Sequence, residues 1–582
     1  MRLKLFFAFL LACVFLSPVW AQTKAEAESG TLQNGGSVAN STLASGGQYV
    51  QMQEGNLELS VTVASAGLYT MNFVYSNTYG DKFQNLVING EEAGQVAFPQ
   101  TGAVLAFSGS VEQTVRLNAG TNSVAITKSW GWIDLDYIEL APYQEATFDI
   151  NPKLVTPNPS VNAQKLYHFL RENFAKKIIS GVQTGFDLVN LQSLDAQQEF
   201  KFITDASGKS PALLGLDFIM GTGYNAINSA NPNSWYQSYN DMTITLAKEI
   251  WKRGGIPAYS WHWKDPMQTV DAFYVQGSGD PYTTFSISSA CTDENCTAWN
   301  TNSAEYQAIA GDIDVVAGYL KELQNEGVAV LWRPVHEASG GWFWWGRDKK
   351  AKPFVALYNL IFDKLVNEHG LNNLIWVWNS DGTDSDWYPG DEKVDIIGRD
   401  FYYYPEIKNH ASLIGEFDKL KSVFGTSKII TLSENGSIPH PENMIADKAR
   451  WSYFMPWYGE HTGSDGSTTH NSASDWNLVM NHDYTITLES MPGWENYSKI
   501  ANQNILRGQS NISVFPTLIR ESVTIQCAKG LSIQVVDSRG KVIASQKAAS
   551  GQTVLSSLNW AKGVYFVSVS GNKTLKTFKV IR

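Results

Sequence analysis

The chain has 582 residues, a formal net charge of −12 and a sequence pI near 5.3. Its length exceeds what one hydrophobic core usually supports, so we expect two to four domains. The acidic balance argues against a polyanionic partner, and nucleic acid is therefore not expected as a ligand. Aromatic residues make up 12% of the chain, including 20 tryptophans, which favours recognition of flat ligands.

The first residues have the pattern of a secretory signal. Arg2 and Lys4 form a basic start, residues 5–16 form an apolar run, and Val19-Trp-Ala21 provides a small-residue cleavage site. Because this apolar run is too short to span a bilayer, we predict a signal peptide over residues 1–21 rather than a membrane anchor. A lipidated Cys13 is the alternative.

Cleavage of that signal would leave three cysteines, Cys291, Cys296 and Cys527. Cys291 and Cys296 are close enough in the sequence for a small disulfide loop, which an oxidising compartment permits. Their spacing lacks the partner ligands of a zinc site, so no zinc site is expected there.

Residues 22–143 have the pattern of an all-β domain, with short alternating segments separated by Gly and Asn turns. Asn89-Gly90 has the sequence of a hairpin turn. The length and the pattern together predict a β-sandwich. Its expected strands include Leu57–Val63, Gly67–Tyr75, Leu86–Ile88 and Ser123–Thr127.

A proline-bearing linker follows over residues 144–160. Beyond it, helical and apolar strand patterns alternate over residues 161–503. Ser160 is placed to cap the first helix. The apolar residues expected on one face of this helix are Ala163, Leu166, Phe169, Leu170 and Phe174.

Eight apolar segments in this region read as buried parallel strands. Eight strand–helix units over roughly 340 residues predict a (β/α)8 TIM barrel, and so an α/β fold class for the largest domain. The expected strands are Lys177–Gly181, Ala212–Asp217, Ile256–His262, Val328–Arg333, Leu374–Trp378, Val394–Asp400, Lys428–Glu434 and Trp451–Trp457.

Polar residues recur where these strands end. Barrel enzymes build their active sites at the carboxyl ends of the strands. Chance could place one or two polar residues there, whereas five or six predict an active site. The residues are Asp217, His262, Arg333 with Glu337, Asn379, Asp400 and Glu434.

The segment Trp332-Arg-Pro-Val-His-Glu-Ala-Ser-Gly-Gly-Trp-Phe-Trp-Trp-Gly346 carries the densest signal. The end of an apolar strand is followed by a cation, an imidazole and a carboxylate, and then by Trp342, Trp344 and Trp345. Sugars present polar edges to such charges and apolar C–H faces to aromatic rings, so we interpret the tryptophans as walls of a sugar-binding site. The alternative is a core strand followed by an aromatic loop that packs beneath it.

Glu337 and Glu434 are the two carboxylates that we pair. Cleavage of a glycosidic bond requires an acid on the leaving oxygen and a second carboxylate near the anomeric carbon. The fourth and seventh strands of a barrel lie across its mouth, so residues that end them can face each other. Glu434 ends an apolar strand, where a charge is costly unless it is functional or paired. The alternative is that each glutamate only forms an ion pair with a nearby arginine.

Three further side chains are expected near this pair. His336 could orient Glu337 or contact a sugar hydroxyl, although a purely structural hydrogen bond is the alternative. Tyr402 could donate to the nucleophilic carboxylate, and Trp457 could form a sugar platform. For these two rings, ordinary packing is the alternative.

Arg333-Pro-Val-His-Glu337 and Gly341-Trp-Phe-Trp-Trp-Gly346 resemble glycoside hydrolase family 26, largely β-mannanases among the retaining (β/α)8 hydrolases. The resemblance spans residues 161–503 in strand order. Further matching segments are Ile178–Gly181, Pro211–Asp217, Ser260–Trp263, Asp395–Tyr402 and Ser433–Gly436. Arg399 departs from the family pattern, for which an apolar or small residue is expected there. This arginine could add a contact at the rim or simply pair with an acid.

This resemblance implies that Glu337 is the acid/base and Glu434 the nucleophile. The expected substrate-binding residues in the barrel are His262, Arg333, His336, Trp342, Asp400, Tyr402 and Trp457.

The N-terminal segment resembles carbohydrate-binding module family 35. The matching pieces are Ala25–Glu28, Gly46–Val50, Asn89-Gly90, Gly120–Asn122 and Trp130–Ile138. The resemblance implies a structural Ca²⁺ ion held by Glu26, Glu28 and Asp136, and carboxylate oxygens suit that ion. Acids that simply face water are the alternative. Trp130 is the expected sugar platform, with Trp132 as a second candidate.

Residues 508–582 predict a small C-terminal β-sandwich. Phe515-Pro516, Asp537–Lys541 and Gly563–Val567 resemble the sorting domain of type IX secretion cargo, although the usual Pro-Asn-Pro is Phe-Pro-Thr here. The resemblance implies contact with the outer-membrane secretion machinery and export to the medium or the cell surface. A second binding sandwich is the alternative.

The sequence therefore predicts a secreted, monomeric, retaining endo-glycosidase that hydrolyses the β-1,4 bonds of mannan, glucomannan or galactomannan without a catalytic cofactor. Within enzymes, the same barrel could instead act on mixed-linkage β-glucan or β-1,3-xylan. Outside enzymes, the chain could be a surface polysaccharide-binding protein with a vestigial barrel. The presence of both glutamates argues against that last alternative.

Overall fold

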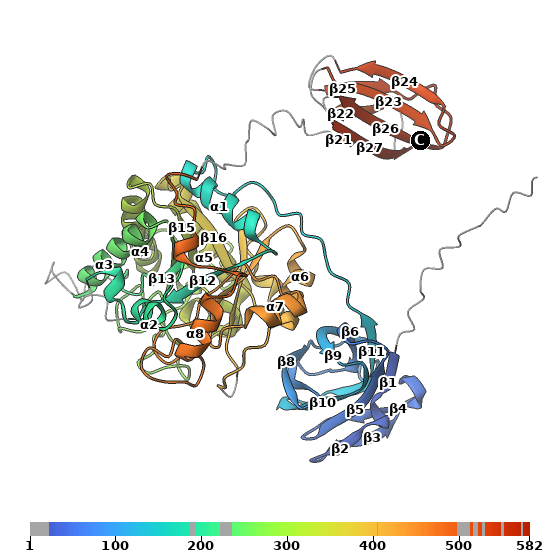
Figure 1. Cartoon of the computed structure of the whole chain (residues 1–582), viewed down its shortest axis with the longest axis horizontal. Coiled ribbons are helices and arrows are strands. Elements are labelled where there is room, and N and C mark those ends of the chain that lie inside the picture. The colour runs from blue at the N-terminus through green and yellow to red at the C-terminus, as the bar shows by residue number, and fades with distance from the viewer. Residues whose placement is uncertain are drawn as a thin grey trace, which may run out of the picture. The chain divides into compact units, whose positions relative to one another are not determined.

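A computed structural model describes residues 23–185, 192–221, 235–403, 406–497, 513–515, 522–526, 530–548, 552–571 and 574–582 (Figure 1). The predicted signal peptide lies outside these residues. The chain divides into two compact units, Met1–Asn496 and Tyr497–Arg582. Over the part of the chain that the structure describes, every helix is too short or too polar to cross a membrane.

The N-terminal domain is a sandwich of two antiparallel sheets. One sheet has the order β3 (Ser37–Asn40), β4 (Gln48–Gln51), β11 (Asp134–Pro142), β6 (Gly67–Ser76) and β9 (Gly109–Leu117), and β1 (Thr23–Glu26) pairs with β11. The other has the order β2 (Thr31–Gln33), β5 (Asn56–Val63), β10 (Gly120–Trp130), β7 (Lys82–Ile88) and β8 (Glu91–Phe98).

Strict alternation of side chains explains this sandwich. Along β5, Leu57, Leu59, Val61 and Val63 are buried, and the residues between them face water. Their side chains join a core formed by both sheets. Asn89 and Gly90 both adopt positive φ and connect β7 to β8, as expected for an Asn-Gly hairpin. The predicted β-sandwich is confirmed.

The central domain is the predicted (β/α)8 barrel, and all eight expected strands are present. Their parallel order runs from β12 through β13, β14, β15, β16 and β17 to β18, while β19 pairs with β12. A parallel bridge between Asn435 and Pro456 joins the two ends of the sheet. The strands are β12 (Ile178–Gln183), β13 (Leu213–Asp217), β14 (Ile256–Trp261), β15 (Val330–Pro334), β16 (Leu374–Asn379), β17 (Ile396–Phe401), β18 (Ile429–Asn435) and β19 (Tyr453–Phe454).

Helices alternate with these strands along the chain (Figure 1). They are α1 (Val161–Asn173), α2 (Gln198–Ser207), α3 (Trp235–Lys252), α4 (Ala304–Asn325), α5 (Ala351–Phe362), α6 (Ile414–Phe424), α7 (Pro441–Asp447) and α8 (Ala473–Met480). A short additional strand, β20 (Thr485–Ile486), also pairs with β12.

The first helix begins where the sequence predicts. The side chain of Ser160 accepts a hydrogen bond from the backbone N–H of Ala163, which caps α1. The predicted apolar face is buried, including Leu166 and Leu170. Between β14 and α4, a long loop contains the disulfide Cys291–Cys296, which confirms the pairing that the sequence permits.

Polar contacts join the sandwich to the barrel within the first unit. Asp418 of α6 accepts hydrogen bonds from the hydroxyls of Thr114 and Tyr143. Arg116 of β9 forms an ion pair with Asp447 of α7. These contacts place one edge of the sandwich against two helices that follow barrel strands.

The C-terminal unit contains two antiparallel sheets in its described residues. One has the order β21 (Ser513–Phe515), β22 (Ser522–Gln526) and β25 (Gln552–Ser556). The other has the order β24 (Val542–Lys547), β23 (Ser532–Asp537), β26 (Val564–Gly571) and β27 (Thr574–Ile581). Both contribute buried side chains to one core, which confirms the predicted small β-rich domain.

Candidate active site

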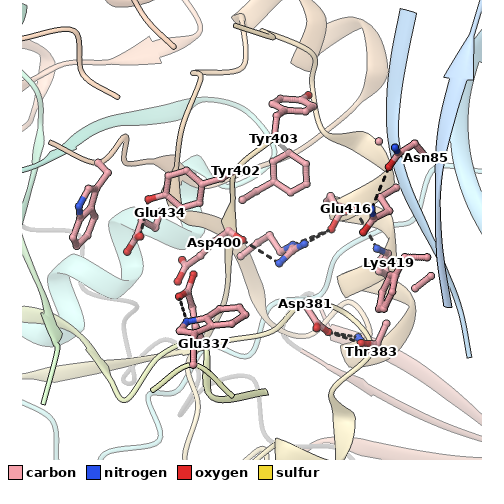
Figure 2. A pocket seen from close by; sticks show the side chains of 18 of the residues that line it. Asn85, Glu337, Asp381, Thr383, Asp400, Tyr402, Tyr403, Glu416, Lys419 and Glu434 are labelled. Atoms are coloured by element: carbon pink, nitrogen blue, oxygen red, sulfur yellow. Dashed lines mark hydrogen bonds and ion pairs between the residues drawn. The ribbon is translucent and has the colours of Figure 1, made fainter. Parts of the chain in front are cut away.

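A cavity of about 570 Å³ opens at the carboxyl ends of the barrel strands (Figure 2). It contains both predicted catalytic residues, Glu337 and Glu434. In Figure 2 their carboxylates point into the same space, on either side of Asp400. Five of the other predicted site residues also line it, namely His262, Trp342, Asp400, Tyr402 and Trp457.

Glu434, near the end of β18, is held by two donors. The guanidinium of Arg333 donates from Nη2 to Oε2 of Glu434 at 2.8 Å. The hydroxyl of Tyr402 donates to Oε1 at 2.7 Å, as the sequence predicts. Each carboxylate oxygen therefore has a fixed partner, so the side chain has one defined orientation.

Arg333 lies beneath the cavity and connects two acids. Its Nη1 donates to Oδ2 of Asp400 at 2.6 Å, while Nη2 contacts Glu434. Burial alone would lower the pKa of Arg333, but the charges of Asp400 and Glu434 outweigh that effect and raise it. The guanidinium therefore stays charged and compensates the negative charge that the site concentrates.

Asp400 is itself anchored on its other oxygen. Oδ1 accepts hydrogen bonds from Asn379 Nδ2 at 2.8 Å and from Ser433 Oγ at 2.7 Å. Burial raises the pKa of Asp400 to about 6, although Arg333 acts in the opposite direction. Asp400 is thus a rigidly held ion-pair partner of Arg333 rather than a free side chain at the rim.

Glu337 has a contrasting environment. Burial raises its pKa well above the usual range, and the charges of Asp400 and Glu434 raise it further. Its Oε2 accepts one hydrogen bond, from Nε1 of Trp342 at 3.0 Å. A carboxyl group in these surroundings retains its proton at a pH where an exposed glutamate has lost it.

The backbone around Glu337 is strained. Val335 and Glu337 have φ values of 46° and 54°, the left-handed region that residues other than glycine rarely adopt. For the β-branched Val335 this conformation is particularly costly, on the order of 1–3 kcal/mol. These two conformations form a sharp turn after β15, and the side chain of Glu337 enters the cavity from this turn.

A chain of three side chains lies beside the carboxylates. Asp217, at the end of β13, contacts Nδ1 of His262 at 2.5 Å. Nε2 of His262 lies 3.2 Å from Nε2 of His336. Burial lowers the pKa of His336 well below its usual range, and Arg333 and His262 add to that effect, so His336 is uncharged at neutral pH. The described polar contact of the His336 ring is thus with His262 rather than with Glu337.

The tryptophans after β15 divide into two groups, which corrects the prediction that all three form walls of the site. Trp342 is 38% exposed and lines the cavity. Trp344 and Trp345 are fully buried, and their indole N–H groups donate to the backbone oxygens of Trp263 and His336. Short 3-10 turns over Ala338–Gly340 and Trp344–Lys349 direct these two rings into the core.

The cavity continues beyond the carboxylates toward the sandwich. In Figure 2, Asp381, Thr383, Glu416 and Lys419 lie between the catalytic pair and Asn85 of β7. Residues of the sandwich that line this part are Phe83, Asn85, Glu92, Gly94, Gln95 and Ala97. These strands have only an ordinary alternating pattern, so no local sequence signal indicates this role.

Arg399 takes one of the two roles expected for it. It forms an ion pair with Glu416 of α6, with Nη2 to Oε2 at 2.8 Å. Its Nη1 also donates to the backbone oxygen of Asp400. Arg399 therefore pairs with an acid, and it lines the cavity as well.

The predicted aromatic platform lies on the sandwich. Trp130, at the end of β10, is 68% exposed, and Trp132 is 58% exposed. Nε1 of Trp132 donates to Glu54 at 2.8 Å, whereas no described residue accepts from the indole of Trp130. In the described part of the chain, Trp130 is not among the residues that line the barrel cavity.

The three acids expected to hold Ca²⁺ lie around one turn of the sandwich. Ser45 donates from its backbone to both oxygens of Asp136 and from its hydroxyl to Glu26. A Cβ atom on Gly46 would lie 3.2 Å from Oε1 of Glu28. Oε2 of Glu26 and Oε2 of Glu28 are buried without a hydrogen-bond partner among the described residues. Such orphan carboxylate oxygens fit a hard cation, although Lys24 also contacts Glu26 at 2.8 Å.

A (β/α)8 barrel with carboxylates at the ends of its fourth and seventh strands has the arrangement of a barrel glycosidase. The chain belongs to glycosyl hydrolase family 26, whose model matches residues 155–490. The model of carbohydrate binding module family 35 matches residues 23–143. A secretion system C-terminal sorting domain matches residues 513–582 and marks the chain for export to the cell surface or the medium. The predicted families of all three domains are thereby confirmed.

Two similar sequences are mannan endo-1,4-beta-mannosidases. A mannan endo-1,4-beta-mannosidase of Thermothelomyces thermophilus is 33% identical over 438 residues, which cover 74% of this chain and 81% of the relative. Mannan endo-1,4-beta-mannosidase B of Piromyces sp is 33% identical over 500 residues, covering 83% and 80%.

Solved structures show the same likeness. A GH26-CBM35 beta-(1,4)-mannanase of Podospora anserina is 31% identical with a TM-score of 0.53, covering 81% of this chain and 99% of that chain. A ruminal GH26 endo-beta-1,4-mannanase is 29% identical with a TM-score of 0.60, covering 81% and 98%. A beta-mannanase from a symbiotic protist of the termite Reticulitermes speratus, complexed with gluco-manno-oligosaccharide, is 42% identical with a TM-score of 0.53, covering 60% and 100%.

Proposed function

We propose that this chain is a secreted, retaining endo-β-1,4-mannanase that acts on mannan, glucomannan or galactomannan. One observation carries the chemistry: the two cavity carboxylates have opposite environments. Glu337 is partly buried and has a raised pKa, whereas the buried Glu434 accepts hydrogen bonds from Arg333 and Tyr402. Such a contrast separates the acid from the nucleophile.

In the first step, the carboxylate of Glu434 attacks the anomeric carbon and forms a glycosyl–enzyme ester. The glycosidic C–O bond breaks, and its oxygen takes the proton of Glu337. Arg333 and Tyr402 keep Glu434 oriented during the attack, because both of its oxygens are held before the substrate arrives.

In the second step, Glu337 removes a proton from water, whose oxygen then attacks the same carbon and releases Glu434. The charge of Glu434 is absent in the ester, so one of the effects that raise the pKa of Glu337 disappears. Glu337 thereby becomes a better base at the stage that requires one. The double displacement leaves the anomeric configuration unchanged.

The proposed specificity for mannan rests on the relatives. Both are named mannan endo-1,4-beta-mannosidase, and each alignment covers most of the relative and most of this chain. The cavity extends from the catalytic pair past Asp381 and Lys419, which suits a chain of sugars rather than a single terminal residue. The N-terminal module would hold the polysaccharide through Trp130, and Glu26, Glu28 and Asp136 would hold a structural Ca²⁺ ion in it.

The stereochemistry of the first products tests the mechanism. Proton NMR of mannopentaose hydrolysis, recorded within the first minutes, should show the β-anomer accumulating before mutarotation. The variant Glu434→Ala should lose turnover and still bind insoluble mannan through residues 22–143. Initial release of the α-anomer, or full activity of Glu434→Ala, would contradict the proposal.

A product profile tests the substrate. Mannan, glucomannan and galactomannan should each yield a ladder of short oligosaccharides early in the reaction, as internal cleavage requires. Mixed-linkage β-glucan and β-1,3-xylan serve as controls and should remain intact. Faster hydrolysis of either control would assign the barrel to that polysaccharide instead.

A further inference from the structure

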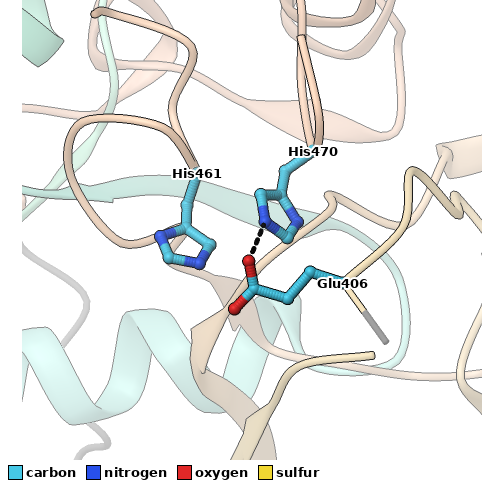
Figure 3. Close-up of side chains that lie close together, drawn as sticks. All are labelled: Glu406, His461 and His470. Atoms are coloured by element: carbon cyan, nitrogen blue, oxygen red, sulfur yellow. Dashed lines mark hydrogen bonds and ion pairs between the residues drawn. The ribbon is translucent and has the colours of Figure 1, made fainter. Parts of the chain in front are cut away.

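A second cluster of ligating side chains lies outside the catalytic pair (Figure 3). Glu406 follows β17, and His461 and His470 belong to the segment between β19 and α8. One ligand atom from each of the three lies within 4.8 Å of the others. In Figure 3 the two imidazole rings and the carboxylate converge on a common space from two different loops.

One distance within the cluster is close to that between two ligands of a tetrahedral metal ion, and the other ligand atoms lie within 4.8 Å. Nε2 of His470 lies 3.3 Å from Oε2 of Glu406. Two ligands bound at about 2.0–2.2 Å in tetrahedral geometry lie roughly 3.4 Å apart. The rings of His461 and His470 have centroids 4.3 Å apart and planes inclined by 32°, so they are not simply stacked face to face.

His461 has polar atoms that the described residues leave unsatisfied. Its Nδ1 and Nε2 are both buried, and within the described part of the chain neither has a hydrogen-bond partner. A buried polar atom without a partner has lost its hydrogen bonds to water, which is a free-energy cost to the folded state. A metal ion bound to one of these nitrogens would remove that cost for the atom concerned.

The surroundings fix both histidines in place. The side chain of Asn471 is buried and donates to the backbone oxygens of His461 and Gly436, while its Oδ1 accepts from the backbone N–H of Ile438. A Cβ atom on Gly436 would lie 3.0 Å from Nδ1 of His470, so glycine permits the close approach of that ring. The backbone of His461 is therefore held, and space for the ring of His470 is present, before any ion binds.

Access and charge also suit a cation. His470 is 1% exposed, whereas the side chain of Glu406 is 48% exposed, so an ion could enter from the side of Glu406 and keep a water ligand there. Among the described residues, Glu406 forms an ion pair with His470, which is itself a proposed ligand. The acids Glu460 and Glu434 add negative potential at His461.

We propose that Glu406, His461 and His470 form a binding site for one divalent transition-metal ion, with Zn²⁺ as the best fit, beside the active site. Two imidazoles and one carboxylate suit Zn²⁺ better than Ca²⁺ or Mg²⁺, which prefer oxygen ligands. The ion would join the loops after β17 and β19.

Its position connects it to the nucleophile. The ring of His461 lies 5.0 Å from that of Tyr402, edge to face, and Tyr402 donates to Glu434. An ion that fixes His461 would therefore also restrict the movement of Tyr402. The site is structural in this proposal and takes no part in bond cleavage.

Another cluster, His410, His440 and Asp475, provides an internal comparison. Its two rings are stacked nearly parallel, with planes at 11° and centroids 3.9 Å apart, so their in-plane lone pairs do not converge. The ammonium of Lys408 lies 2.5 Å from Asp475 and opposes a cation there. His440→Gln is thus a matched control for His461→Gln.

The experiment uses the untagged full chain, stripped with EDTA and dialysed against Zn²⁺ at micromolar concentration. Metal content by mass spectrometry should be one equivalent in the parent and in His440→Gln, and near zero in His461→Gln and His470→Gln. Added Zn²⁺ should raise the melting temperature of the barrel by several degrees in the first two proteins and leave the others unchanged.

Glu406→Gln keeps the test decisive if a buried histidine variant does not fold, because Glu406 is half exposed. This variant should fold and bind Zn²⁺ at least about tenfold more weakly, as expected when a metal site loses a charged partner. Absence of Zn²⁺ binding in the parent would overturn the proposal. Undiminished binding in both His461→Gln and Glu406→Gln, or loss of the ion in His440→Gln alone, would also overturn it.

Discussion

The hydroxyl of Tyr402 donates a hydrogen bond to Oε1 of Glu434 at 2.7 Å, and the opposite oxygen of the same carboxylate is held by Arg333. Burial raises the pKa of Tyr402 well above its usual range, and the charge of Glu434 raises it further, so the hydroxyl keeps its proton. Tyr402 is therefore a permanent donor to the proposed nucleophile.

Removal of this donor should slow the reaction. A hydrogen bond to a charged group contributes about 1.5–3 kcal/mol, so Tyr402→Phe should lower kcat/KM on mannopentaose roughly 10- to 150-fold. Tyr403→Phe is the matched control, since Tyr403 also lines the cavity and, among the described contacts, it is Tyr402 and not Tyr403 that bonds Glu434. Equal kcat/KM values for the two variants would show that the Tyr402 bond is not used in the transition state.

Neutralisation of Glu337 should stabilise the protein. The pKa of Glu337 is raised in the folded state, first by burial and then by Asp400 and Glu434. The folded state therefore holds this proton more tightly than the unfolded chain, and stability is lost as the pH rises above about 4.5, the range of an ordinary glutamate. Glu337→Gln avoids that loss, so its advantage in melting temperature should grow between pH 4 and pH 8.

Glu434→Gln is the control for that comparison. It removes one of the two carboxylates that compensate the buried guanidinium of Arg333, so it should melt below the parent. Scanning fluorimetry at several pH values would compare the three proteins. A melting temperature of Glu337→Gln equal to or below that of the parent at pH 7 would contradict the assigned environment of Glu337.

The alkaline limb of the pH–rate profile should respond to Asp400. With Glu337 as the proposed acid, that limb of kcat/KM reports the loss of its proton from the free enzyme. The charge of Asp400 raises the pKa of Glu337, so Asp400→Asn should move the limb to lower pH, independently of any fall in kcat. Asp381→Asn, which alters another acid of the cavity, should leave the limb in place. An unchanged limb in Asp400→Asn would exclude this coupling.

The barrel and the two carboxylates of its cavity could be predicted from the sequence because their signals are local. A parallel strand buried on both faces is a continuous apolar run, and a charged residue that ends such a run has few structural explanations. Arg333 and Glu434 are therefore conspicuous in the sequence alone. Their ion pair joins β15 to β18 across the barrel mouth, which no local pattern could indicate.

Other features depend on backbone geometry that the pattern does not encode. Trp342 and Trp344 are two residues apart in one aromatic segment, yet one lines the cavity and the other is buried. The chain leading to these rings passes through left-handed conformations at Glu337 and Gly341 and through short 3-10 turns, which the sequence pattern does not encode. The contact between His262 and His336 similarly joins two strand ends that are distant in the sequence.

The platform on the sandwich should separate binding from catalysis. Trp130 is largely exposed, and an exposed aromatic ring that anchors a ligand typically contributes more than about 1.4 kcal/mol, a factor of ten in affinity. Trp130→Ala should therefore weaken binding to insoluble mannan at least about tenfold. Binding is measured by pull-down, with the substitution placed in the inactive Glu434→Ala variant, and hydrolysis is measured with Trp130→Ala alone. Hydrolysis of mannopentaose should be unchanged, since Trp130 is not among the described residues that line the cavity.

Two controls make this prediction specific. Tyr79→Ala removes another strongly exposed aromatic ring of the same sandwich and should leave mannan binding intact. Trp132→Ala should have a smaller effect than Trp130→Ala, because the indole of Trp132 is already tied to Glu54 and is less free to adjust to a sugar. If Tyr79→Ala weakened binding as much as Trp130→Ala, the loss would reflect general exposed aromatic area, and the assignment of Trp130 as the platform would be wrong.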